Sequence, residues 1–248
     1  MRYAELLSAE LAGQIASGAP AILPLGALQP HGSHLPLGLD LLVAEAFAAR
    51  LGRLVDGIVL PALLTPVTTA PQPHSLQVST AGFRIVMDDT LDGLVRAGWQ
   101  TIAVVSGHYA PAHEIELYEA AMRVMDDHPG VRVFAAAPLE PLADEGLLDH
   151  AGQIETSLLM AIRPDLVRLD EFEKSGVVGE DPRGATAEEG ERLLHLGLEA
   201  WVNWMSADPT ELTRWYGVRF DVHQPFVDAY FKGSWEDANL AWWADWSR

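Results

Sequence analysis

The segment Thr101–Ser106, with the sequence TIAVVS, has the clearest strand character in the chain. It is short, apolar and rich in β-branched residues, and the polar pair Gly107 and His108 follows it directly. A run of this kind is typical of a strand buried on both faces, as in a parallel sheet. On either side of it, short apolar runs alternate with longer amphipathic segments.

This alternation predicts the elements of the fold. Further strands are expected at Ala21–Gly26, Gly57–Leu64 and Val131–Ala136, with Pro61 placing the second at a sheet edge. Helices are expected at Leu41–Leu54, Thr80–Ala97, Glu114–Met125, Ile154–Ile162 and Ala187–Met205. Strand–helix alternation predicts an α/β fold, a three-layer sandwich in which a mainly parallel central sheet has helices on both faces.

The composition excludes several classes of function. The chain has 35 acidic and 16 basic residues and a formal net charge of −19, which argues against binding to nucleic acid or to an anionic membrane surface. It has no cysteine, so disulfides, thiol nucleophiles and zinc–thiolate sites are excluded. Any metal ion must therefore be held by histidine, carboxylate or neutral oxygen ligands.

No stretch reaches the roughly 18–20 apolar residues that a membrane span requires. The first residues, MRYAELLSAE, carry acidic side chains and lack the basic region and apolar core of a signal peptide. From these features we expect a cytoplasmic protein.

Polar clusters follow two of the predicted strands. Residues 29–40, QPHGSHLPLGLD, follow the first strand, and His108 follows the strand at 101–106. The carboxyl ends of parallel strands meet at one edge of a sheet, so these clusters can converge on one crevice. Imidazole and carboxylate groups there suit a divalent metal such as Zn²⁺ or Mn²⁺. The alternative is structural, with His31 and His34 capping loops and Asp40 forming the N-cap of the following helix.

A third cluster, HAGQIETS, covers residues 150–157. Small residues between His150 and Glu155 allow a loop to deliver one or both side chains into a cavity. The alternative is an ordinary helix start with Glu155 exposed.

We assign the remaining polar side chains no role in the site. The three on the helix after His108 are expected on a solvated face: His113, Glu114 and Glu116. No role is assigned to His195 or His223.

Five segments, in order, resemble the creatininase (creatinine amidohydrolase) family. Residues 26–40, GALQPHGSHLPLGLD, are similar to the family's Glu-Gln-His-Gly-Pro-His-Leu-Pro signature, which ends on aspartate. SGHY at 106–109 resembles Asn-Gly-His, and HAGQIETS resembles His-Ala-Gly-x-x-Glu-Thr-Ser. PHSLQVST at 73–80 and GVVGEDPRGATAEEGERLL at 176–194 give weaker support. The resemblance covers about residues 1–205.

The family's members are typically binuclear metal amidohydrolases and often hexamers, so the resemblance implies a homo-oligomer acting on a small-molecule amide. It implies one ion held by His31, Asp40 and Glu155, and a second held by Asp40, His108 and position 29. His150 matches the family's proton-transfer histidine. We therefore expect one or two Zn²⁺ or Mn²⁺ ions per subunit and an attacking water activated by the metal.

The sequence also departs from the family pattern. Position 29 is glutamine instead of glutamate, so the second ion should bind more weakly or not at all. Pro30 replaces glutamine, Ser106 replaces asparagine, and Ala110 stands where creatininase itself has glutamate. We therefore expect creatinine not to be the substrate.

Three functions remain open. The leading hypothesis is a metal-dependent amidohydrolase, or its cyclising counterpart, acting on a non-peptide or cyclic amide. The alternative is a degenerate member that binds a ligand or one metal without turnover, as a structural or regulatory subunit. A nucleotide-binding protein is the weakest hypothesis, because no glycine-rich phosphate loop follows a strand.

Residues 206–248 form an aromatic-rich extension beyond the resemblance, with a composition that argues against disorder. We expect it to pack on the domain or on a neighbouring subunit. Its aromatic residues include Trp215, Phe220, Phe226, Tyr230, Phe231, Trp235, Trp242, Trp243 and Trp246.

Overall fold

The computed structural model describes residues 1–70, 72–142 and 145–230. The strands are β1 (Ala21–Gly26), β2 (Ile58–Val59), β3 (Leu63–Leu64), β4 (Thr101–Ser106) and β5 (Arg132–Ala136). The α-helices are α1 (Ser8–Ala16), α2 (Leu39–Leu54), α3 (Thr80–Arg96), α4 (Pro111–Asp127), α5 (Gln153–Ile162), α6 (Ala187–Trp204) and α7 (Pro209–Tyr230). The predicted α/β class is confirmed.

The strands form one sheet in the order β2-β1-β4-β5, with β3 also paired to β1, and every pair is parallel. The prediction of one strand over Gly57–Leu64 is wrong. The chain forms two short strands there, β2 and β3, on either side of Pro61. Proline has no N–H group to donate to a neighbouring strand, which explains the interruption.

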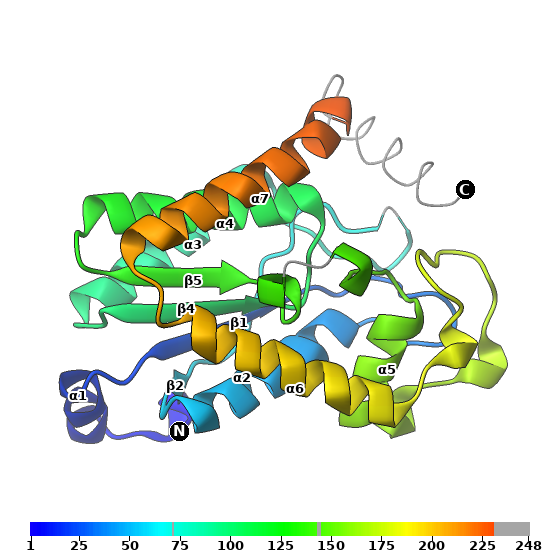
Figure 1. Cartoon of the computed structure of the whole chain (residues 1–248), viewed down its shortest axis with the longest axis horizontal. Helices are drawn as coiled ribbons and strands as arrows, with labels where there is room; N and C mark the ends of the chain where they lie inside the picture. Colours follow the sequence, from blue (N-terminus) through cyan, green and yellow to red (C-terminus); the bar gives the residue numbers. More distant parts are fainter. Residues whose placement is uncertain (71, 143–144, 231–248) are drawn as a thin grey trace.

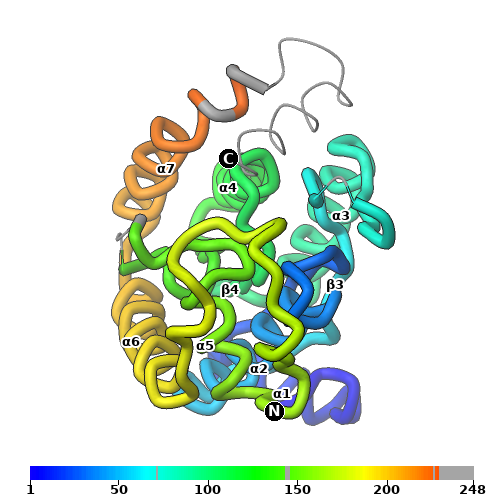
Figure 2. Tube along the Cα trace, turned by 90° about the vertical axis from the view of Figure 1, so that its right-hand side faces the viewer, coloured from blue at the N-terminus to red at the C-terminus, as the bar shows by residue number. Residues whose placement is uncertain are grey.

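Helices cover both faces of the sheet (Figure 1). Helices α3 and α4 lie on one face, with α7 outside α4, and α2, α5 and α6 lie on the other. The strand arrows of Figure 1 point towards the side that faces the viewer in Figure 2, where the loops after β1 and β4 lie. The sheet therefore brings the predicted polar clusters to one end of the molecule.

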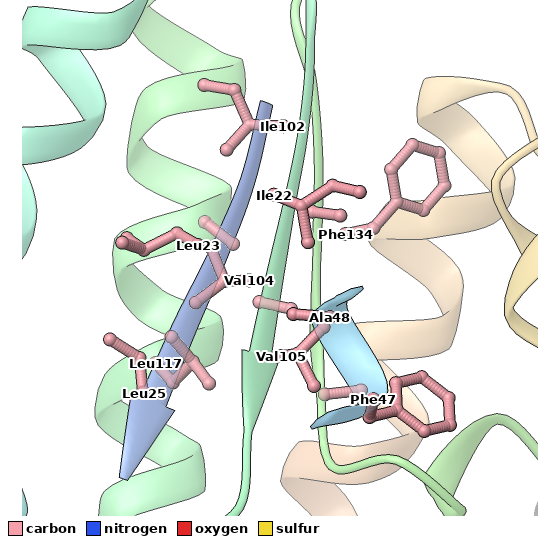
Figure 3. Close-up of a cluster of buried hydrophobic side chains, with 14 of the residues drawn as sticks. Ile22, Leu23, Leu25, Phe47, Ala48, Ile102, Val104, Val105, Leu117 and Phe134 are labelled. Carbon is pink, nitrogen blue, oxygen red and sulfur yellow. The ribbon is translucent and has the colours of Figure 1, made fainter. Parts of the chain in front are cut away.

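The core follows from the pleat of the central strands. In β1, Leu23 and Leu25 point towards Leu117 of α4, whereas Ile22 points to the opposite side, where Phe47 of α2 lies (Figure 3). All five side chains are at most 1% exposed. Because both faces are buried, the strand is a continuous apolar run, as the sequence indicated.

Helix α7 packs against α4 and reaches the edge strand β5. The hydroxyl of Tyr216 donates to the carbonyl oxygen of Val133 at 2.7 Å and accepts the backbone N–H of Ala135 at 2.8 Å. Trp215 stacks near Trp204 of α6, with ring centroids 4.5 Å apart. The rest of the predicted extension, residues 231–248, lies outside the described residues. This part includes Phe231, Trp235, Trp242, Trp243 and Trp246.

The prediction of a solvated face on α4 is wrong. His113, Glu114 and Glu116 are all buried. His113 lies against Ser106 at the end of β4, whereas Glu114 faces α7 and Glu116 faces α3. Each of these buried side chains has a polar or charged neighbour. Glu116 binds Arg84 of α3, with Nε to Oε2 at 2.5 Å.

A buried polar network joins α4, α7 and the short helical turn at Glu140–Leu142. Glu140 accepts from the Nε of Arg219 at 2.9 Å, from the backbone N–H of Ala137 at 3.0 Å and from the hydroxyl of Tyr118. The Nε2 of His223 lies 3.1 Å from a carboxylate oxygen of Glu114. His223, to which the sequence assigned no role, is therefore part of the contact between α7 and the domain.

Among the described residues, the helices are all too short or too polar to cross a membrane.

Candidate metal centre

The loops after β1 and β4 and the start of α5 converge where the strands end. Two glycines make this possible. A Cβ atom on Gly107 would lie 1.9 Å from the carbonyl oxygen of Asp40, and one on Gly26 would lie 2.5 Å from the Cα of Leu41. The ends of β1 and β4 thus contact the first turn of α2 backbone to backbone, which brings Asp40 close to His108.

Asp40 lies inside helix α2, not at its N-cap as predicted. The helix begins at Leu39 and Gly38 precedes it. Asp40 is 1% exposed, and its carboxylate faces two histidines: Oδ1 is 2.7 Å from His31 Nε2, and Oδ2 is 3.3 Å from His108 Nδ1. Burial raises the pKa of Asp40, but the charge of His31 and the neighbouring His108 lower it more. Asp40 is therefore ionised.

His31 is fully buried, and its ring is held in one orientation. Its Nδ1 lies 3.0 Å from the backbone carbonyl oxygen of Gln29, which can only accept, so Nδ1 carries the hydrogen. Its Nε2 is directed at the carboxylates and lies 2.7 Å from Asp40 Oδ1. Burial lowers the pKa of His31, but the charges of Asp40 and Glu155 outweigh burial and raise it to about 9. The position beside Nε2 therefore attracts positive charge.

Gln29 and His108 lie on the other side of Asp40. The amide nitrogen of Gln29 is 3.0 Å from Asp40 Oδ2 and 3.2 Å from His108 Nδ1, and its amide oxygen accepts the backbone N–H of Ala70 at 2.8 Å. His108 Nε2 is 2.9 Å from the carbonyl oxygen of Val67. The loop after β3 therefore fixes both side chains.

Glu155, in the first turn of α5, completes the carboxylate pair. One carboxylate oxygen accepts the backbone N–H of Ala151 at 2.6 Å, and the other accepts from the hydroxyl of Tyr109. Burial, and then the nearby acids Asp149 and Asp40, raise the pKa of Glu155 to about 8 against the opposing charge of His31. A cation in the pocket would relieve this repulsion between carboxylates.

His150 lies beside His31, with ring centroids 4.6 Å apart. Its Nε2 is 3.2 Å from the carbonyl oxygen of Pro30, so Nε2 carries a hydrogen. Burial, together with the charge of His31, lowers the pKa of His150 to about 3, which keeps the ring neutral. His31, His150 and Glu155 each offer a ligand atom within 4.8 Å of the others.

A small cavity of about 20 Å³ opens among these side chains. This is room for about one water molecule or one ion. Two non-glycine residues here have left-handed backbone conformations: Thr68, which lines the cavity, with φ of 60°, and Ala151, which follows the lining residue His150, with φ of 54°. Such conformations cost energy and cluster at functional sites. The lining residues are Gln29, Asp40, Thr68, Ala70, Gly107, His108, Tyr109, Ala110, His150 and Glu155.

The donor set fits a divalent cation. Two buried carboxylates, Asp40 and Glu155, lie beside the Nε2 of His31, and imidazole with carboxylate is a ligand combination that Zn²⁺ and Mn²⁺ accept.

The structure brings together all six predicted site residues, Gln29, His31, Asp40, His108, His150 and Glu155. Two further residues escaped sequence reasoning. Tyr109 follows His108 directly, which could have suggested it, but nothing in the sequence pairs it with Glu155. Asp149 accepts the backbone N–H groups of Ile154 and Glu155 and so anchors the start of α5.

Other histidines of the motifs lie away from the cavity. His34 is buried against Phe172, and its Nε2 is 3.0 Å from the hydroxyl of Thr156. His74 is exposed. Ser106 and His113 lie behind His108 and contact each other, with Ser106 Oγ 3.2 Å from His113 Nε2.

Comparison with known proteins agrees with the resemblance of the motifs. The family described as creatinine amidohydrolase (creatininase) matches residues 4–205. A creatinine amidohydrolase from Pseudomonas putida is 28% identical over 191 residues, covering 67% of this chain and 73% of the relative. A mycofactocin precursor peptide peptidase from Mycolicibacterium smegmatis is 28% identical over 217 residues, covering 73% of this chain and 82% of the relative.

Solved creatininase structures share the fold. The crystal structure of creatinine amidohydrolase superposes with a TM-score of 0.72 at 21% identity, covering 82% of this chain and 96% of that one. A manganese form of creatininase gives a TM-score of 0.71 at 21% identity, and a mutant described as Zn-Zn type gives 0.72 at 20%. For both structures, the match covers 82% of this chain and 96% of the creatininase chain.

Proposed function

The chain belongs to the creatininase family of hydrolases that act on C–N bonds, and from this premise we propose that it is a metal-dependent amidohydrolase. Its substrate is a small non-peptide or cyclic amide. The observation that carries the proposal is the fully buried Nε2 of His31, which faces the carboxylates of Asp40 and Glu155.

His31, Asp40 and Glu155 would hold a divalent ion, Zn²⁺ or Mn²⁺. Such an ion lowers the pKa of a bound water and polarises an amide carbonyl. The hydroxyl of Tyr109 and the backbone N–H of Ala151 each bind one carboxylate oxygen of Glu155, and together they hold the carboxylate in one orientation. Bonds of this kind to a metal ligand hold it in the geometry that the ion requires.

His150 would move the proton. Its neutral ring lies beside His31, with Nε2 bonded to the carbonyl oxygen of Pro30, and would take a proton from the attacking water. The same ring can then protonate the leaving nitrogen of the amide. Formation of a cyclic amide is the reverse of this hydrolysis and would use the same residues.

The side chains that line the cavity bear on the choice of substrate. Ala110 lines this space and brings no polar group, where the creatininase pattern has glutamate. We therefore propose an amide other than creatinine. A second candidate, a family member that binds without turnover, is favoured by Gln29, whose neutral amide stands at a position where the family has a carboxylate.

The test combines metal analysis with a substrate panel. Protein purified without chelator should contain Zn²⁺ or Mn²⁺, and it should hydrolyse at least one lactam, hydantoin or non-peptide linear amide from a panel that also holds short peptides. Hydrolysis of the peptides alone would contradict the proposed substrate class. Removing the metal with a chelator should abolish turnover, and adding the ion back should restore it. Turnover that persists in fully metal-free protein would contradict the proposal, and a metal-loaded protein inactive on the whole panel would favour the binding-only alternative.

A further inference from the structure

We propose that the side chain of Gln29 takes the place of a second metal ion, so that the centre holds a single divalent cation beside His31. This inference rests on the proposed metal-dependent function and specifies how many ions serve it. It separates this chain from the two-zinc form of creatininase described above.

The orientation of the Gln29 amide is fixed by a group that can only donate. The backbone N–H of Ala70 points at the amide oxygen of Gln29 at 2.8 Å, and both residues are buried. Rotating the amide by half a turn would place its NH₂ group against this N–H, leaving two donors facing each other away from water. The amide nitrogen must therefore face the cavity.

At that position the nitrogen meets two acceptors. It lies 3.0 Å from Asp40 Oδ2 and 3.2 Å from His108 Nδ1, which are themselves 3.3 Å apart. His108 Nε2 donates to the carbonyl oxygen of Val67, so Nδ1 presents a lone pair. An NH₂ group has two hydrogens, so it can satisfy both acceptors. Those lone pairs are the ones that a second ion would need.

A glutamate at this position would behave differently. A carboxylate has two acceptor oxygens, so one could accept the N–H of Ala70 while the other bound an ion together with Asp40 and His108. The amide has only one oxygen, and Ala70 uses it. The charge balance agrees, because two carboxylates, Asp40 and Glu155, stand among the described residues that line the cavity, enough to neutralise one divalent ion.

The proposal can be tested by counting Mn²⁺ ions in the intact protein and in two matched variants. Gln29→Glu supplies the missing carboxylate. Gln77→Glu makes the same change outside the cavity, at a side chain whose amide oxygen likewise faces a backbone N–H, that of Thr69 at 3.3 Å. Equilibrium binding gives the stoichiometry, and electron paramagnetic resonance distinguishes an isolated Mn²⁺ ion from a spin-coupled pair.

The unchanged protein and Gln77→Glu should bind one Mn²⁺ per chain and give the spectrum of an isolated ion, whereas Gln29→Glu should bind two and give that of a coupled pair. A coupled pair in the unchanged protein would overturn the Gln29 inference and leave the metal-dependent function intact. No bound Mn²⁺ and no bound Zn²⁺ in the unchanged protein would overturn both. Because the unchanged protein alone gives the first result, the test stands even if Gln29→Glu fails to fold.

Discussion

The hydroxyl group of Tyr109 is hydrogen-bonded to a carboxylate oxygen of Glu155. The same hydroxyl lies 2.7 Å from the backbone carbonyl oxygen of Asp149. Tyr109 comes from the loop after β4, and Glu155 from the first turn of α5, 46 residues away. One phenol thus ties together two loops that supply residues to the candidate metal centre.

Tyr109→Phe should weaken metal binding without unfolding the protein. The ring stays in place, but one oxygen of Glu155 loses the donor that orients it. Loss of a bond to a metal ligand typically costs about 10–100-fold in affinity. Zn²⁺ titration monitored by calorimetry would measure this, with the exposed Tyr3→Phe as the control. Equal affinities in the two variants would show that Tyr109 does not position Glu155.

His150→Ala and Glu155→Ala should separate proton transfer from metal binding. His150→Ala should keep the metal and the fold but lose turnover by about 10²–10⁴-fold, as expected for removal of an acid–base group. Glu155→Ala should lose metal and turnover together. The measurements are metal content and kcat on the substrate identified by the panel, and the exposed His195→Ala is the control.

One outcome would reassign His150. Because its ring offers a ligand atom within 4.8 Å of those of His31 and Glu155, the geometry also allows it to bind the ion. If His150→Ala releases the metal, His150 is a ligand.

Gly107→Ala should destabilise the protein strongly. The added Cβ would lie 1.9 Å from the carbonyl oxygen of Asp40, so β4 and α2 would have to move apart. We expect the free energy of unfolding to fall by about 3 kcal/mol or more, as for severe overpacking of a core. Urea denaturation would measure the change. Gly13→Ala, in helix α1 with open space around it, should instead stabilise by about 0.5–1 kcal/mol.

Glu140→Gln should destabilise the protein in a pH-dependent way. Burial raises the pKa of Glu140, but His223, Arg219 and Tyr118 lower it more, so the folded pKa lies below the ordinary value of 4.5. The ionised carboxylate therefore stabilises the fold above about pH 4.5, and this contribution is lost as the pH falls through the folded pKa. Removing a charged acceptor of Arg219 should cost about 1.5–3 kcal/mol at pH 7.

Urea denaturation at pH 7 and at pH 3.5 would test this. The difference between the unchanged protein and Glu140→Gln should shrink at the lower pH. Glu191→Gln, which removes an exposed partner of Arg50, should cost no more than about 1 kcal/mol at pH 7. A Glu140→Gln penalty that grows on acidification would contradict the assignment of Glu140 as ionised.

The strands and the meeting of the polar loops could be predicted from the sequence, because hydrophobic runs are local and parallel strands share one carboxyl edge. The strand Thr101–Ser106 was predicted to the residue. The place of Asp40 was not, because helical propensity favours aspartate at an N-cap, whereas here the carboxylate is held inside the first turn by His31 and His108.

Features that depend on distant segments could not be predicted. The buried state of Glu114 depends on α7, which begins at Pro209, far along the chain. The direction of the Gln29 amide depends on the N–H of Ala70, 41 residues away. A single sequence shows which residue types stand near a strand end, but hydrogen bonds to another loop decide which atoms of those residues face the cavity.

The contact between Tyr216 and β5 has a consequence beyond the docking of α7. β5 is an outer strand, and its free backbone groups could pair with a strand of another molecule and start aggregation. The phenol hydroxyl of Tyr216 engages Val133 and Ala135, the carbonyl and the N–H that such a strand would seek. Helix α7 thus occupies backbone groups on the outer side of β5 and hinders growth of the sheet between molecules.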